Sequence, residues 1–461
     1  MNTTESRYDS ESRFDPESKP ITETNPVPGT EKPTHTYTTL ERCLALALIG
    51  WGYAFFRLYP VYRHPKSALV LLCCLFGLTL FVLYKTGHKL RGMALAGCLS
   101  AVPVCVSLAL PANALIHTLA FLYGLAAFAY TVYAACGNTL ENGFSDLLPI
   151  DLLKAIFCMP FSALGGLFAA LRSEKNGHLC RRIFAGFGRV LGGFSLALIP
   201  TFVVLFLLSY DDKFLQEVWH VLTKLYPHEN VLSHLLYFTL GFLFAIYLFG
   251  LYTAAKENRC PTLLTADGCR KTAAALHSFS PITTVSAVLP VLFLYGIFLF
   301  TQWDSYISVW GTLPDTVIYS EYARKGFFEL CLVSMVNLVL LTASGMATRK
   351  QNDRPHPAVR VLHIVLSVCT LLLGTTAMAK LFLYMQVYGL TEKRVYAAWF
   401  MLVLACIFIL VIVKQFCPRL RVVALAMAVC VGMFAILALS NMNERIDKYN
   451  VDHGFDVTLC E

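Results

Sequence analysis

Long runs of apolar residues separated by short polar loops dominate the chain beyond its first forty residues. The runs are unbroken rather than alternating, which excludes the strand pattern of a β-barrel. A helix needs about 20 apolar residues to cross a bilayer, so we predict an all-α, polytopic transmembrane helix bundle of about eleven spans. The expected spans are 43–59, 67–84, 92–110, 114–136, 183–210, 232–254, 285–302, 326–346, 361–388, 396–414 and 422–441.

The segment 147–171 is apolar but interrupted by polar residues and prolines. Asp151 and Lys154 lie three residues apart and therefore share one face of a helix. Pro149 and Pro160 break the segment further. We expect a helix that lies in the membrane interface. A spanning helix is the alternative.

The distribution of lysine and arginine predicts the orientation. With a cytoplasmic N-terminus and eleven spans, the cytoplasmic loops carry roughly twice as many of these residues as the outer loops, as the positive-inside rule requires. A further span at 147–171 would move Arg172, Lys175, Arg181 and Arg182 to the outer side. We therefore expect the N-terminus inside and the C-terminus outside.

The two ends of the chain differ from its middle. Residues 1–41 are rich in Ser, Thr, Glu, Asp and Pro and hold no apolar run, which predicts a disordered cytoplasmic tail. We do not expect them to act as a signal peptide, because the first apolar core begins only after Arg42. We expect the transmembrane bundle at 42–441 and an external tail at 442–461.

Composition excludes several other classes of protein. Hydrophobic residues make up 57% of the chain and charged residues 14%, too little polar surface for a soluble globule of this length, so lipid must cover the rest. The net charge of +8 is scattered over short loops, so we expect a lipid bilayer as partner and no nucleic acid. Motifs of phosphate loops, serine-hydrolase elbows and HExxH metalloproteases are absent from the sequence.

Cysteine and histidine give no sign of a metal or cofactor site. Most of the 16 cysteines fall inside apolar spans, where they pack as small apolar residues, and we expect neither a disulfide nor a zinc site. His117, His234 and His363 lie in or near spans and are expected to be buried and hydrogen-bonded rather than metal ligands. We expect no cofactor.

Polar residues gather at the predicted outer ends of the C-terminal helices, in the stretches 209–214, 302–330, 388–396 and 441–456. This external cluster is our candidate functional region. Its residues are Asp211, Asp212, Glu321, Tyr322, Arg324, Glu329, Lys380, Tyr388, Arg394 and Asn450.

Glu329 and Lys380 are placed inside the predicted hydrocarbon region, about one and two helical turns from the outer ends of their helices. A lone charge at that depth is costly, so each is a candidate partner for the other. The pair predicts either a polar pocket or ion path, or a structural ion pair that fixes helix register. A lysine that extends to the membrane surface is a further alternative.

Three strings in the last third of the chain carry a resemblance to a known family. They are EYARKGFFEL (321–330), YGLTEKRVYAAWFM (388–401) and NERIDKYNVD (443–452). Together with the order of elements from SYDDKF (209–214) to the C-terminus, they resemble an uncharacterised family of bacterial multi-pass membrane proteins with a domain of unknown function. The resemblance implies a protein of the bacterial inner membrane. It implies no catalytic residue, since the family has no established activity.

Three classes of function remain open. A transporter or channel for a small solute or ion is favoured by Glu329, Lys380 and the external polar residues. A membrane-embedded enzyme acting on an envelope or lipid-linked substrate would use Asp211, Asp212, Glu321, Tyr322 and Arg324, but nothing in the sequence fixes their geometry, and the residues favour a protein that is not an enzyme. A non-catalytic sensor or assembly factor is the third class.

Overall fold

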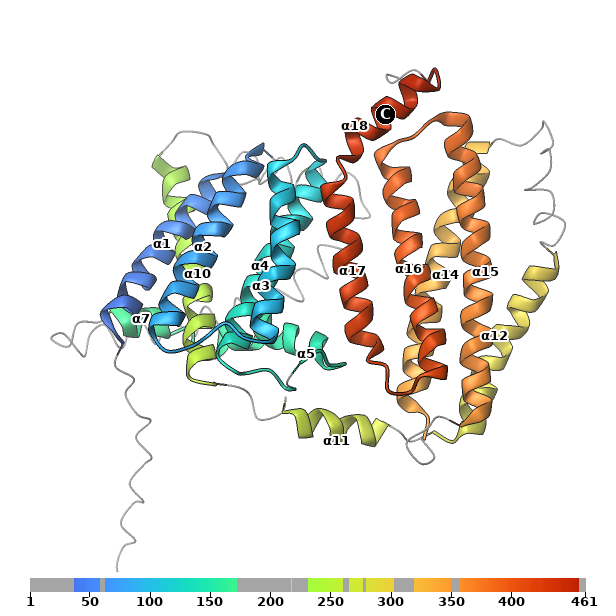
Figure 1. The fold of residues 1–461 in the computed structure, drawn as a ribbon, viewed down its shortest axis with the longest axis horizontal. Coiled ribbons are helices and arrows are strands. Elements are labelled where there is room, and N and C mark those ends of the chain that lie inside the picture. The colour runs from blue at the N-terminus through green and yellow to red at the C-terminus, as the bar shows by residue number, and fades with distance from the viewer. Residues whose placement is uncertain are drawn as a thin grey trace, which may run out of the picture. The chain divides into compact units, whose positions relative to one another are not determined.

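The computed structural model describes residues 37–58, 63–141, 143–171, 217, 231–259, 265–276, 279–301, 319–349 and 356–455. The described residues from Thr38 onward belong to one compact unit. Every regular element within these described residues is a helix, which confirms the all-α prediction (Figure 1).

Eight of the described helices are long and apolar enough to cross a membrane. This identifies the chain as a multi-pass integral membrane protein. The eight helices are α2 (Pro65–Lys85), α4 (Ala114–Ala135), α10 (Val231–Lys256), α12 (Pro281–Thr301), α14 (Tyr319–Ala347), α15 (Pro357–Tyr388), α16 (Glu392–Phe416) and α17 (Val422–Leu439).

Three of the predicted spans are not among these eight helices. Helix α1 (Thr39–Leu58) is long enough but carries Glu41, Arg42 and Arg57. Helix α3 (Met93–Val106) and its continuation, the 3-10 turn η2 (Ser107–Ala109), form a shorter apolar helix. The predicted span 183–210 lies outside the described residues. The total of eleven spans therefore stays a prediction.

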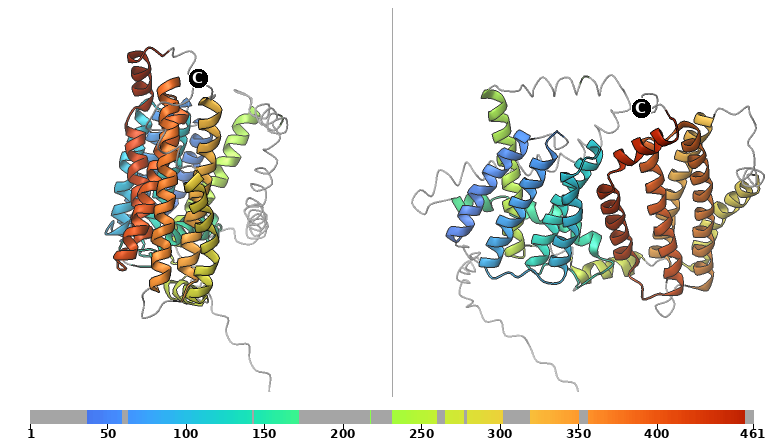
Figure 2. Two further views of the ribbon diagram at one scale, coloured as in Figure 1. Left: turned by 90° about the vertical axis from the view of Figure 1, so that its right-hand side faces the viewer. Right: turned by 45° about the horizontal axis from the view of Figure 1, so that its top comes forward.

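Segment 147–171 folds as four short pieces that lie across the ends of longer helices (Figures 1 and 2). The pieces are α5 (Leu148–Leu153), the π-helical turn η3 (Lys154–Cys158), α6 (Met159–Ser162) and α7 (Gly166–Leu171). Proline has no N–H to bond the carbonyl four residues earlier, so Pro160 leaves the carbonyl of Ile156 without its helical donor. The hydroxyl of Tyr247 on α10 donates to that carbonyl at 2.7 Å instead.

Helices α1 and α10 pack at very close range. A Cβ atom added to Gly52 would lie 2.2 Å from the carbonyl oxygen of Gly241, so only glycine allows the two backbones to approach this closely. At one end of the pair, Tyr53 and His234 are hydrogen-bonded at 2.9 Å.

The C-terminal helices pack in chain order, α14 on α15, α15 on α16 and α16 on α17, with α12 against α15. Helix α17 also packs on α3, and its Ala435 joins a hydrophobic core with Ala101 and Val104. The remaining short helices, α11 (Ala266–Leu276) and α18 (Met442–Asp452), follow α10 and α17 in the chain.

Candidate functional site

Three residues of the predicted external cluster meet at the turn between α15 and α16. Asn450 of α18 is 1% exposed, and its amide binds the turn twice. It donates to the carbonyl of Leu390 at 2.9 Å and accepts from the N–H of Leu390 at 2.8 Å. This paired contact docks α18 on the turn, since a buried amide needs both partners.

Arg394 holds the same turn from the α16 side. Its guanidinium donates to the carbonyls of Tyr388 at 2.9 Å and Gly389 at 2.6 Å, and to the hydroxyl of Tyr384 at 3.1 Å. The carbonyls at the end of a helix lack intrahelical donors, and an arginine there satisfies them. The N–H groups of Arg394 therefore bond the carbonyls at the C-terminal end of α15, and this is a structural role.

Two other members of the external cluster have side chains that the structure describes. Lys380 is 9% exposed on α15, whereas Glu329 is exposed on α14. The ion pairs found among the described residues do not include one between Lys380 and Glu329, so the pairing of Lys380 with Glu329 stays a prediction. Asp211 and Asp212 lie outside the described residues, as do the side chains of Glu321, Tyr322 and Arg324.

A set of polar side chains lies between α12, α14 and α15, inside their membrane-competent segments except for Thr348, which directly follows α14. Asn337 is 0% exposed, donates to the hydroxyl of Thr370 at 2.8 Å and accepts from the hydroxyl of Tyr295 at 2.6 Å. A second polar contact between α14 and α15 lies near the C-terminal end of α14, where the Ser344 hydroxyl is 2.8 Å from Nε2 of His363. We call this set the polar interface: Thr284, Tyr295, Asn337, Ser344, Thr348, His363, Ser367 and Thr370.

Two features of the polar interface define its extent. At one end, the hydroxyls of Thr284 and Thr348 are 2.8 Å apart. Beyond Thr370, Leu373 and Ala377 continue the same face of α15 and pack in an apolar cluster with Leu330. Along α15, this apolar layer lies between Thr370 and Lys380, with the buried Thr376 beside it.

Ser367 differs from the rest of the polar interface. Its side chain is 0% exposed, and its hydroxyl has no hydrogen-bond partner among the described residues. It follows His363 by four residues and precedes Thr370 by three, so the three side chains lie on one face of α15.

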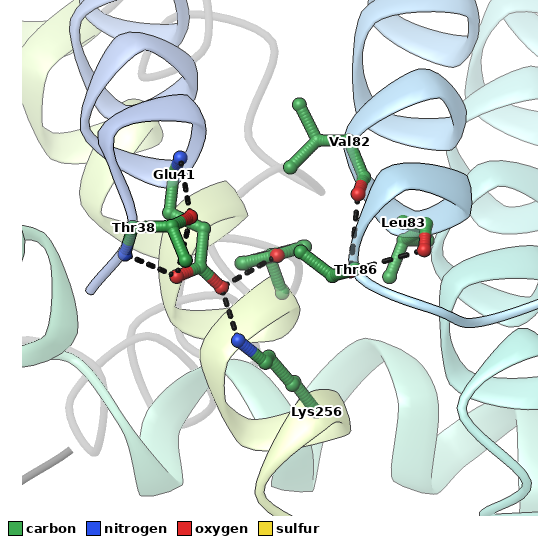
Figure 3. A network of polar contacts seen from close by, with 7 residues as sticks. Thr38, Glu41, Val82, Leu83, Thr86 and Lys256 are labelled. Atoms are coloured by element: carbon green, nitrogen blue, oxygen red, sulfur yellow. Dashed lines mark hydrogen bonds and ion pairs between the residues drawn. The ribbon is translucent and has the colours of Figure 1, made fainter. Parts of the chain in front are cut away.

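A second network joins the first turn of α1 to the end of α10 (Figure 3). Glu41 is 0% exposed and accepts from the backbone N–H of Thr38 at 2.8 Å. The Thr38 hydroxyl in turn accepts from the N–H of Glu41, which makes a capping box. The other carboxylate oxygen accepts from Lys256 at 2.5 Å and from the Tyr252 hydroxyl at 2.8 Å.

These contacts determine the charge state of Glu41, which lies outside the predicted span 43–59. Burial raises the pKa of its carboxyl, but the hydrogen bonds from Lys256, Thr38 and Tyr252 and the charge of Lys256 outweigh burial. The net result is a pKa below the ordinary value of 4.5. Glu41 is therefore held as a carboxylate.

Asp151 of α5 is the second buried carboxyl, 2% exposed. It accepts from the Tyr133 hydroxyl at 2.8 Å and from the N–H of Leu140 at 3.1 Å. Burial is the largest influence and raises its pKa above the ordinary 3.8, although these bonds and Lys154 act in the opposite direction. Lys154 is 3% exposed, with its ammonium 5.6 Å from the centre of the Tyr133 ring.

Sequence reasoning placed the polar chemistry mainly in the external cluster and missed Glu41 and Asn337. A signal for each is present in the sequence. Thr38 and Glu41 form the T-x-x-E pattern of a capping box directly before an apolar run. The polar residues of α14 and α15 recur at helical spacing inside apolar spans, which indicates a shared buried face. The expected hydrogen bonds of His117, His234 and His363 are confirmed.

In the part of the chain that the structure describes, no group of three or more His, Cys, Asp or Glu side chains is arranged to hold a metal ion. The chemistry available at the polar interface is that of hydroxyls, one amide and one imidazole. Such groups both donate and accept hydrogen bonds, so they can pass on or solvate a small polar species.

Comparison with known families gives one match. A family model described as a domain of unknown function, DUF4153, matches residues 93–458. The chain belongs to this family. The DUF4153 region begins well before the 209–214 stretch from which the resemblance was expected to run, and it contains the whole polar interface and the α15–α16 turn. Glu41 lies before it, so the α1–α10 ion pair joins a residue outside the DUF4153 region to one inside it.

No curated protein and no solved structure matches the chain. The DUF4153 match assigns no activity to the chain.

Proposed function

We propose that this DUF4153 protein is a transporter of a small solute or ion in the bacterial inner membrane, with its path along the polar interface of α12, α14 and α15. One observation carries the proposal: three membrane-competent helices are joined by buried polar side chains, at whose centre Asn337 bonds both Tyr295 and Thr370. Polar groups are expensive in hydrocarbon and typically mark substrate or ion paths in membrane proteins.

The apolar layer of Leu330, Leu373 and Ala377 fits this proposal as a closed gate. Hydrophobic constrictions block ion and water movement by excluding water. Opening would require α14 and α15 to separate at this layer, which would connect the polar interface to Lys380. The external cluster of the sequence analysis would then line the outer mouth.

The proposed topology is eleven spans with the N-terminus inside and the C-terminus outside. Its support is the excess of lysine and arginine in the loops assigned to the cytoplasm. The disordered tail 1–41 would then be cytoplasmic and the tail 442–461 external. Segment 147–171 would lie in the inner interface, because its four pieces are each too short to cross the membrane.

The competing explanation is that the polar interface only holds the three helices together, because interhelical hydrogen bonds also stabilise membrane bundles. A transport assay separates the two. Purified protein would be reconstituted into liposomes adsorbed on a solid-supported electrode. Charge movement would then be recorded on concentration jumps of protons, Na⁺, K⁺, chloride, phosphate and amino acids.

We expect a current with at least one solute, its near-complete loss in Asn337→Leu and a clear reduction in Tyr295→Phe. The matched control is Thr375→Val. Thr375 lies on the exposed side of α15, and its hydroxyl bonds only the carbonyl of Leu372 in its own helix. Absence of current with every solute, or equal currents in Asn337→Leu and the control, would refute the proposal.

A further inference from the structure

The transport path contains one imidazole, the side chain of His363, and an imidazole can gain and lose a proton. His363 is 5% exposed and lies about two turns from the start of α15. Its Nε2 is 2.8 Å from the Ser344 hydroxyl of α14. A buried imidazole bonded to a hydroxyl can both accept and release a proton.

The charges around His363 do not fix it in the protonated state. Helices α12 and α15 contain no Asp or Glu. The carboxylates of α14 and α16 are Glu321, Glu329 and Glu392, and in α14 both precede Ser344, the residue that contacts His363, by 15 or more positions. Without a fixed carboxylate beside it, an imidazolium here would readily release its proton.

The cations near the same end of the helices make other contacts. Arg360 of α15 lies over the Phe416 ring, 5.3 Å from its centre, and Lys414 of α16 donates to the carbonyl of Leu420. Arg349 follows α14. On α14, Gly345 borders the ring beside Ser344, since a Cβ added there would be 3.7 Å from Cε1 of His363.

The same lack of carboxylates argues against an alkali or divalent cation as the species moved. Hard cations in proteins are held by several oxygens, usually including carboxylates. The polar interface offers neutral hydroxyls, an amide and an imidazole. Ser367 adds a fully buried hydroxyl with no partner among the described residues, positioned between His363 and Thr370.

We infer that the species moved along the polar interface is the proton, and that it binds at His363. This inference rests on the proposed function and names its substrate. The neutral imidazole takes up one proton from water on one side of the membrane. It returns to the neutral form by releasing one proton toward the other side. The Ser367 hydroxyl, next along α15, accepts that proton on its oxygen as it passes its own proton on, so no other reactant is consumed.

The test uses the full-length protein in liposomes that enclose a pH-sensitive dye. A potassium gradient with valinomycin sets the membrane potential. Wild-type protein should change the internal pH when the potential is applied. In His363→Gln, whose amide can still bond Ser344 but cannot titrate, we expect the proton flux to fall at least ~10-fold, because proton transfer needs a titratable group. The control is His453→Gln, an exposed histidine of the C-terminal region.

Two further variants separate chemistry from structure. Ser367→Ala removes the buried hydroxyl and should slow the flux, whereas Ser367→Thr keeps a hydroxyl and should retain it. The melting temperature of each variant in detergent shows whether it is folded. A folded His363→Gln protein with wild-type proton flux would overturn the inference.

The outcomes also separate this inference from the proposed function. A wild-type current carried by another solute, with no change of internal pH and no dependence on His363, would reject the proton while leaving the transport proposal standing. Liposomes that move neither protons nor any other solute would reject both.

Discussion

At the scale of single residues, the buried carboxyl groups of Glu41 and Asp151 have pKa values shifted in opposite directions. Glu41 accepts from a lysine, a tyrosine and a backbone N–H, and its pKa is lowered. Asp151 accepts from a tyrosine and a backbone N–H, and its pKa is raised because burial dominates. Removing the charge should therefore have opposite effects at the two positions.

Glu41→Gln should lower the free energy of unfolding by about 2–4 kcal/mol, because it leaves the partly buried Lys256 without its counter-charge. Asp151→Asn should leave stability unchanged or raise it slightly. The asparagine oxygen can still accept from Tyr133 and Leu140, while the costly buried charge is removed. Unfolding in mixed micelles with increasing dodecyl sulfate measures both. Equal losses in the two variants would contradict this assignment.

The pH dependence of stability follows from the same two groups. The stability that Glu41 contributes is present above pH 4.5, its ordinary pKa, and is lost as the pH falls through the lowered pKa of the folded state. The contribution of Asp151 to stability depends on pH in the opposite direction. Its contribution is present below its ordinary pKa of 3.8 and is lost as the pH rises through the raised pKa of the folded state.

Melting temperatures between pH 7 and pH 3 provide the measurement. The gap between wild type and Glu41→Gln should narrow below pH 4.5, the ordinary pKa of the glutamate. Any advantage of Asp151→Asn over wild type should disappear toward the acid end. A gap for Glu41→Gln that stays constant down to pH 3 would contradict the lowered pKa.

At the scale of elements, the sequence predicts the bounds of the helices better than the contacts between them. The predicted spans 114–136 and 422–441 agree closely with α4 (Ala114–Ala135) and α17 (Val422–Leu439), since run length and hydropathy are local properties. The π-turn η3 was not predicted. It depends on Tyr247 supplying a donor to Ile156 from a helix 91 residues away in the chain.

The α1–α10 crossing supplies a sharp test of close packing. In Gly52→Ala the new methyl would overlap the carbonyl of Gly241, so the helices must separate, at a cost of about 1–3 kcal/mol. Gly50→Ala is the matched control, because a Cβ there meets nothing within 4 Å. Both substitutions replace glycine by a better helix former, so a difference in unfolding free energy reports packing alone. No difference would mean that the crossing is not close.

The docking of α18 depends on Asn450. Asn450→Ala should detach α18 from the α15–α16 turn and cost about 1–3 kcal/mol, because both backbone groups of Leu390 lose their partner. Hydrogen exchange in residues 442–452 should rise in this variant but not in Lys448→Ala, which changes an exposed side chain of the same helix. Unchanged exchange in Asn450→Ala would show that other contacts hold α18.

At the scale of the whole molecule, topology is the central prediction. In a cysteine-free background, single cysteines at Thr391 and Asp452 should react with a membrane-impermeant maleimide in intact cells. Cysteines at Lys89 and Arg419, at the opposite ends of the helices, should react only after permeabilisation, because the basic loops are expected to stay inside. Labelling of Lys89 or Arg419 in intact cells would contradict the orientation.

The class of this protein follows from local patterns in its sequence. Runs of apolar residues predict membrane-crossing helices, and three strings led us to expect an uncharacterised family with a domain of unknown function. The DUF4153 match over residues 93–458 confirms membership of such a family. These properties are local, so no knowledge of neighbouring helices is needed. The external cluster was also predicted from local sequence alone. Of its ten residues, the described structure brings Tyr388, Arg394 and Asn450 together at one turn.

The tertiary structure alone decided which polar residues are partners. Glu41 and Lys256 are 215 residues apart, and Tyr295 and Asn337 are 42 apart on different helices. The pattern along one helix marks a polar face but does not say which other helix covers it, because interhelical packing depends on shape and on small residues such as Gly52 and Gly241. The buried interface at the centre of the proposed transport path therefore became visible only once α12, α14 and α15 were assembled.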